Sequence, residues 1–120
     1  MVRGIPESDW KVFRDLRTVA LERFCQRVLG DVGRIASDGK RTFHDRYLEI
    51  YKLIDERDDE LARAFNDFRR STAIMQLAVI HSHGLLTPDE LLRFTPATRE
   101  AVESLRELVS TRKSRSPKRR

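Results

Sequence analysis

The sequence contains few residues that interrupt helices, since only five glycines and four prolines occur among its 120 residues. None of them lies between residues 40 and 83, a stretch rich in Leu, Ala, Glu, Arg and Lys, which enter a helix at little cost. A single helix of this length would extend about 65 Å, whereas a compact domain of this size has a radius of gyration of about 13 to 14 Å. Either the helix protrudes and a second chain covers it, or it breaks into two helices, and the sequence leaves both open.

Cysteine and long apolar runs are also scarce. Cys25 is the single cysteine, which excludes an intrachain disulfide and a thiolate metal cluster built from one chain. Its neighbours Phe24, Val28 and Leu29 predict a buried thiol that packs as a small hydrophobe, with a reactive or intermolecular thiol as the alternative. No apolar run approaches the roughly 20 residues that span a bilayer, and the first residues lack a stretch of signal-peptide length. We therefore expect a soluble, cytoplasmic protein without a membrane span.

The net charge of +5 is confined to one end of the chain. Residues 112–120 carry six of the 24 basic residues and none of the 19 acidic ones, so the remainder is close to neutral. This tail contains only Ser, Pro, Lys and Arg after Thr111, and we expect it to be disordered because nothing in it can pack. Its cations could neutralise the phosphates of RNA, DNA or an anionic surface, and the alternative is a solubilising end without a partner. The candidate polyanion-binding residues are Arg112, Lys113, Arg115, Lys118, Arg119 and Arg120.

Amphipathic spacing predicts a first long helix over residues 8–36. Apolar residues recur there at steps of three and four, with Ser8 as the expected N-cap and Gly39 in the turn that follows. Gly30 and Gly33 each cost about 0.5 to 1 kcal/mol relative to alanine inside a helix. They would end the helix early or mark a close backbone approach, and we expect the helix to continue past them.

A second long helix is predicted to begin after Thr42, an N-cap with Asp45 three residues later. Alternating steps of four and three then give a line of positions that is typical of a seam between packed helices. Its exceptions are Arg57, within an acidic cluster at 55–60 expected to be an exposed waist, and Ser71, within 69–72, where a break is expected. The seam residues predicted to contact a partner chain are Tyr47, Ile50, Ile54, Leu61, Phe68 and Met75.

Two shorter helices are predicted nearer the C-terminus. Residues 73–80, which precede these two helices, are apolar nearly all round, and this predicts the centre of the core. Thr87 and Glu90 have capping-box spacing with Pro88 between them, and Pro96 restarts the same pattern for a last helix that ends near Ser110. The apolar stripe expected along that last helix consists of Ala97, Ala101, Leu105 and Leu108, joined by Val102 and Val109.

These elements predict an all-α fold, with two long antiparallel helices followed by two shorter C-terminal helices. We expect a lead-in at 1–7, a single helical domain at 8–110 and the basic tail at 111–120. Because the second helix is longer than one small chain can cover, we expect a homodimeric helical bundle with an isologous interface.

Few residues carry the spacing of a chemical site. His81 and His83 lie two residues apart, which directs them to different faces of a helix, so a metal site with His44 as third ligand is not expected. Arg57, Arg69 and Arg70 could line a pocket for a small anionic ligand, with ordinary ion pairing as the alternative. No catalytic or cofactor-binding residue is indicated, and we expect no cofactor.

The sequence therefore favours a small non-catalytic α-helical interaction or adaptor protein. A nucleic-acid-associated protein that uses the basic tail is the first alternative. A helical-bundle enzyme, or a binder of a small anionic ligand, is the second.

Overall fold

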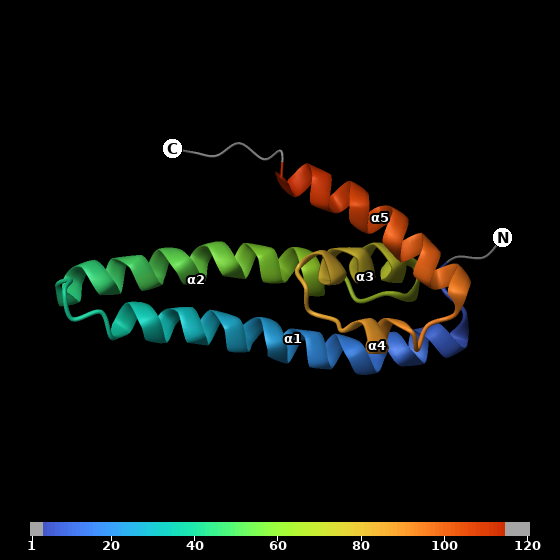
Figure 1. Ribbon diagram of the computed structural model, residues 1–120, viewed down its shortest axis with the longest axis horizontal. Helices are drawn as coiled ribbons and strands as arrows, with labels where there is room; N and C mark the ends of the chain where they lie inside the picture. Colours follow the sequence, from blue (N-terminus) through green and yellow to red (C-terminus); the bar gives the residue numbers. More distant parts are fainter. Residues whose placement is uncertain (1–3, 115–120) are drawn as a thin grey trace.

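The computed structural model describes residues 4–114, and the side chains of residues 4–109. These residues form five α-helices and one 3₁₀ turn and contain no strand, so the all-α prediction is confirmed. Two long helices lie antiparallel along the longest axis, and the three shorter ones gather at one end (Figure 1). No helix in the described part of the chain is long and apolar enough to cross a membrane.

Helix α1 runs from Glu7 to Ala36 and is not interrupted by its two glycines. The N-cap position is Pro6, whose carbonyl accepts the amide of Trp10 at 2.9 Å, so the expectation that Ser8 caps the helix is wrong. Ser8 lies inside the first turn because the helix begins one residue earlier. At the other end, the amide of Ser37 donates to the carbonyl of Gly33 at 3.0 Å.

Helix α2 spans Phe43–Phe65 and begins as predicted, because the hydroxyl of Thr42 accepts the amide of Asp45 at 3.0 Å. It ends before the 3₁₀ turn η1 (Arg70–Thr72) and helix α3 (Ala73–Ser82), so residues 42–83 form two helices. Of the two arrangements that the sequence left open, the structure has the broken one, and the break begins a few residues before the expected 69–72.

Contacts with α1 explain why the chain breaks at this point. The guanidinium of Arg17 donates to the carbonyl of Phe65, which has no helical partner once α2 has ended. The ring of Phe68 stacks on Trp10 at 5.0 Å between ring centroids and lies 5.7 Å from Phe13. A continuous helix would forgo these aromatic contacts, each worth about 0.5 to 1.5 kcal/mol beyond the area that it buries.

Helix α3 is the centre of the core, as predicted. Ala73, Leu77, Ala78 and Ile80 are each at most 1% exposed. Helix α5 (Pro96–Ser114) packs along α3 and crosses it obliquely (Figure 1). It extends beyond the end expected near Ser110, and its buried stripe centres on Thr98 and Val102, whereas Ala97 and Leu108 are exposed.

The short helix α4 (Pro88–Leu91) has the predicted capping box. The hydroxyl of Thr87 accepts the amide of Glu90 at 3.1 Å, and the carboxylate of Glu90 accepts the amide of Thr87 at 2.9 Å. Leu86 and Leu91 flank the turn as a hydrophobic staple requires, the first buried and the second partly buried.

The molecule has two regions, which we call the head and the arm. The head comprises residues 4–24 and 61–109 and contains every described residue that is less than 9% exposed. The arm comprises residues 25–60, the far halves of α1 and α2 with their connecting loop. It makes the molecule elongated, with dimensions of 57 × 29 × 23 Å and a radius of gyration of 16.8 Å, larger than the roughly 13 to 14 Å of a compact domain of this length.

Candidate functional site: the apolar face of the arm

One side of α2 carries a row of exposed apolar side chains along the arm. Tyr47 and Tyr51 are each 66% exposed and Ile54 is 43% exposed. Their steps of four and three residues place them on one face of the helix. Phe43 begins the row and is 84% exposed, with the guanidinium of Arg46 above its ring at 4.6 Å from the centroid.

Helix α1 adds a second row on the same side of the arm. Leu29 is 67% exposed, and Cys25, one turn earlier, is half-buried rather than buried as the sequence predicted. Both line a groove of about 270 Å³ together with Ile54 of α2, which shows that the two rows are adjacent. We call these side chains the apolar face of the arm; it consists of Cys25, Leu29, Phe43, Tyr47, Tyr51 and Ile54.

The opposite side of the arm is charged. A second hollow between α1 and α2 is lined mainly by charged side chains, together with three apolar ones; they are Asp45, Glu49, Lys52 and Glu56, with Ile35, Leu48 and Leu53. Arg41 of the connecting loop also lies there and forms an ion pair with Glu49. This side of the arm therefore carries more charged groups than the apolar face, although neither side is covered by the head.

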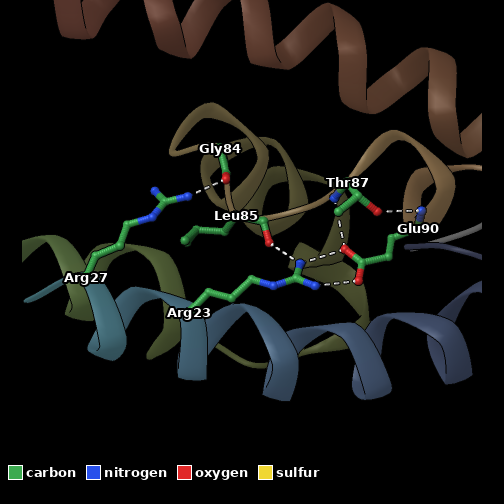
Figure 2. A network of polar contacts seen from close by, with 6 residues as sticks. All are labelled: Arg23, Arg27, Gly84, Leu85, Thr87 and Glu90. Carbon is green, nitrogen blue, oxygen red and sulfur yellow. Dashed lines mark hydrogen bonds and ion pairs between the residues drawn. The ribbon is translucent and has the colours of Figure 1, made fainter. Parts of the chain in front are cut away.

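Arginines of α1 join the arm to the head. The guanidinium of Arg23 binds both carboxylate oxygens of Glu90, at 2.7 and 2.8 Å, and also donates to the carbonyl of Leu85 at 2.8 Å (Figure 2). One turn later, Arg27 donates to the carbonyls of His83 and Gly84, each at 2.7 Å. These contacts tie the middle of α1, where the arm meets the head, to the α3–α4 loop.

The Arg23–Glu90 pair strongly affects the pKa of the glutamate. The hydrogen bond from Arg23 lowers the pKa of Glu90 to about 2, an effect that partial burial opposes and the amide of Thr87 reinforces. Such bidentate arginine–carboxylate pairs are geometrically specific. The pair therefore holds α4 and the α3–α4 loop against the middle of α1.

Asp9 makes a second link inside the head. It is 1% exposed, and its carboxylate accepts the amide of Thr95 at 2.9 Å and the hydroxyls of Thr95 and Thr98 at 2.7 and 2.6 Å. Burial by itself would raise the pKa of Asp9, but these hydrogen bonds lower it below its ordinary value. A carboxylate of α1 thus caps the start of α5, where a negative charge is favourable.

The six residues of the predicted seam lie in different parts of the structure. Tyr47 and Ile54 belong to the apolar face, Ile50 is half-buried toward α1, and Leu61 is half-buried where the arm meets the head. Phe68 follows the end of α2 and packs on Trp10, and Met75 lies on α3. The six residues therefore do not follow one helix, and their contact with a partner chain stays a prediction.

The three arginines of the predicted anion pocket each have a separate partner. Arg57 pairs with Glu60 at 2.8 Å, and Arg69 binds Asp67 at 2.7 Å. Arg70 donates to the carbonyl of Ile5 at 2.7 Å and pairs with Glu7 at 2.9 Å. Ordinary pairing, the alternative reading, describes all three, so these contacts do not assemble a common pocket.

The histidines lie in different environments. His81 Nε2 lies 3.4 Å from Glu103 Oε1, and burial, helped by Arg106, lowers the pKa of His81 below its usual value, so the ring is neutral at pH 7. His83 packs edge-on against Phe24, and His44 is exposed near the start of α2. Among the described residues, no group of three His, Cys, Asp or Glu side chains is arranged to hold a metal ion.

The candidate polyanion-binding residues cannot be placed in this geometry. Arg112 and Lys113 belong to α5, but their side chains lie outside the described ones. Arg115, Lys118, Arg119 and Arg120 lie outside the described residues altogether. Binding of nucleic acid by the tail stays a prediction from the sequence.

Sequence reasoning missed part of the apolar face. It placed Ile50 on the seam instead of Tyr51, although Tyr51 lies four residues after Tyr47 and three before Ile54. It also predicted that the Cys25 thiol is buried, whereas it is half-buried. Both differences have one cause: helical spacing shows which residues share a face, but not which face the neighbouring helix covers.

Comparisons with known proteins add no relative. No protein-family model, no curated protein and no solved structure matches the chain.

Proposed function

We propose that this chain is a small non-catalytic interaction protein, an adaptor that forms a homodimer through the apolar face of the arm. The observation that supports the proposal is the exposure of Leu29, Tyr47 and Tyr51, each 66 or 67% exposed on one side of a projecting helical hairpin. Tyrosine is enriched at protein interfaces because its ring supplies apolar area while its hydroxyl remains compatible with water.

The size of the face agrees with a modest interface. The part of α2 from Phe43 to Leu61 is about 27 Å long, and two packed helices are roughly 18 to 20 Å wide. Each chain would then bury about 500 Å², and the dimer about 1,000 Å² in total, which is near the lower limit for a specific complex. Contiguous apolar patches of several hundred Å² on a monomer mark interaction sites.

A second copy of the chain is the partner that suits this surface. A two-helix face that packs against its own copy produces a four-helix arrangement, in which each apolar row is covered by the other chain. Self-association of this kind is isologous and closes after two subunits. A single interaction surface on each chain is therefore enough to form the dimer.

Light scattering of the purified protein tests the proposal. Because the buried area is near the lower limit for a specific complex, we expect weak dimerisation, and the mass should rise from one chain to two between about 1 µM and about 500 µM. Tyr51→Asp and Ile54→Asp should keep the mass at one chain, because each would bury a charge. Leu48→Asp is the matched control, since Leu48 is also exposed on α2, at 48%, but lines the charged side of the arm.

The proposal fails if the wild-type mass stays at one chain over the whole concentration range. It also fails if Leu48→Asp disrupts the dimer as strongly as the two substitutions on the apolar face. Circular dichroism must show that all variants keep the helicity of the wild type.

The basic tail supports a second candidate, association with nucleic acid, because six cations occur in residues 112–120. Deletion of these residues should abolish binding of RNA or DNA, with a steep dependence on salt before deletion. Binding that survives the deletion would reject this candidate.

A further inference from the structure

The two ends of the arm carry opposite charge. The tip, residues 34–46, has four basic and two acidic residues, whereas the waist, residues 55–60, has five acidic residues and one basic residue. Asp58 of the waist also borders the apolar groove, beside Ile54 and Leu61. Any partner that covers the apolar face will therefore meet a carboxylate at the head end of the groove.

Several charges at the two ends are not neutralised within the chain. In the described part of the molecule neither Lys40 nor Asp58 forms an ion pair, in contrast to their neighbours Arg41 and Arg57, which pair with Glu49 and Glu60. Lys40 lies in the loop just before α2 and is exposed. A basic tip and an acidic waist of the same molecule are thus available to a second molecule.

The orientation of two arms decides which charges meet. In a parallel dimer each group lies beside its own copy, which brings the acidic waist against the acidic waist. Like charges at close range oppose association and select against that arrangement. In an antiparallel dimer the tip of each arm lies beside the waist of the other.

We infer, on the basis of the proposed function, that the two arms pair antiparallel about a two-fold axis between Tyr47 and Tyr51, with Asp58 opposite the partner's Lys40. Lys40 lies seven residues before Tyr47, and Asp58 lies seven residues after Tyr51. Lys40 lies in the loop at the tip of the arm and Asp58 near its head end, so the two charges lie on opposite sides of the axis. At the centre, Tyr47 packs on the partner's Tyr51, so that the two exposed tyrosines of the chain are covered.

This arrangement gives the adaptor two separated heads. The arms overlap over residues 40–58, of which the helical part, residues 43–58, is about 24 Å long. Because one chain is 57 Å long, the antiparallel dimer would be roughly 90 Å long, against roughly 60 Å for a parallel one. Each end then presents one head with its α5 helix, so the dimer can join two partners.

A charge swap tests the pairing of Asp58 with the partner's Lys40. Lys40→Glu and Asp58→Lys should each raise the dissociation constant of the dimer about tenfold at low salt, because each affects two symmetric contacts. The double variant Lys40→Glu/Asp58→Lys restores opposite charges and should return to within about threefold of the wild type. Asp59→Lys, an equal change of charge at an exposed neighbour, is the control and should shift the constant by less than about threefold.

Small-angle X-ray scattering of the dimer supplies an independent readout. A maximum dimension about 30 Å longer than that of the monomer supports the antiparallel arrangement, whereas a dimension close to that of the monomer overturns it. A dimer in which the double variant is no tighter than the single variants also overturns the inference while leaving the proposed function intact. A wild-type chain that stays monomeric rejects both.

Discussion

The head and the arm are built from the same two long helices, yet only the head has a core. Within α2, Ala64 and Phe65 at the head end are at most 1% exposed, whereas Phe43 and Tyr47 at the other end are at least 66% exposed. The difference arises because α3, α4 and α5 all pack at one end of the hairpin (Figure 1). The apolar stripe of an amphipathic helix is thus buried where further helices pack on the hairpin, and it stays exposed where none does.

The largest predicted difference in stability between head and arm is that between substitutions of two phenylalanines of α2. Phe65→Ala should destabilise the fold by about 3 to 5 kcal/mol, because it opens a cavity in the head. Phe43→Ala, at the first position of the same helix, should change stability by less than about 0.5 kcal/mol, since that ring is 84% exposed. Urea denaturation at a concentration where the chain is monomeric measures both, and equal losses would mean that the arm is part of the core.

Asp9 tests the polar link between α1 and α5. Asp9→Asn should cost about 2 to 4 kcal/mol, because a buried carboxylate that accepts three hydrogen bonds becomes an amide that cannot satisfy all of its donors. Asp59→Asn on the arm, where the carboxylate is exposed, should cost less than about 0.5 kcal/mol. Thermal unfolding of the two variants gives the comparison, and a cost for Asp9→Asn below 1 kcal/mol would contradict it.

Acid should weaken the contacts that hold α4 and α5 to α1 within the head. The pKa of Glu90 is about 2 in the folded chain, against 4.5 for a glutamate without partners. Its contribution to the free energy of unfolding is therefore complete above pH 4.5 and is lost as the pH falls toward 2. The pair is partly exposed, so we expect about 1 to 2 kcal/mol. Asp9 contributes in the same direction, since its pKa is also lowered.

The variant Glu90→Gln distinguishes the contribution of Glu90 to acid stability from that of Asp9. At neutral pH it should lower the free energy of unfolding by about 1 to 2 kcal/mol, and it should flatten the dependence of stability on pH below 4.5. Urea titrations at several pH values measure this slope. A variant with the slope of the wild type would show that the Arg23–Glu90 pair does not contribute.

A small stabilising effect is expected from substitution of a glycine of the arm. An added methyl group at Gly30 meets nothing within 4 Å, so Gly30→Ala should stabilise α1 by about 0.5 to 1 kcal/mol. Gly4 of the head differs, because its φ is +86° and a Cβ atom would lie 2.2 Å from the carbonyl oxygen of Arg70. Gly4→Ala should therefore destabilise, and thermal unfolding should move in opposite directions for the two variants.

Local signals in the sequence predicted most of the helices. Thr42 and Thr87 were identified as N-caps, and both make the expected side-chain hydrogen bonds. The run at 73–80 was identified as the core because it is apolar on all sides. The break after Phe65 could not be located to the residue, since no glycine or proline marks it. It depends on Arg17 and Trp10, which lie about fifty residues earlier in the chain.

The sequence by itself determined the all-α class, the capped starts of α2 and α4, and the existence of an apolar stripe along the arm. These follow from interactions between residues within one or two helical turns. Only the tertiary structure decided which side of the arm stays exposed, and it also joined Asp9 to Thr98 and Arg23 to Glu90. Such choices depend on contacts between distant segments, because burial is a property of the packed layers and not of the spacing along one helix.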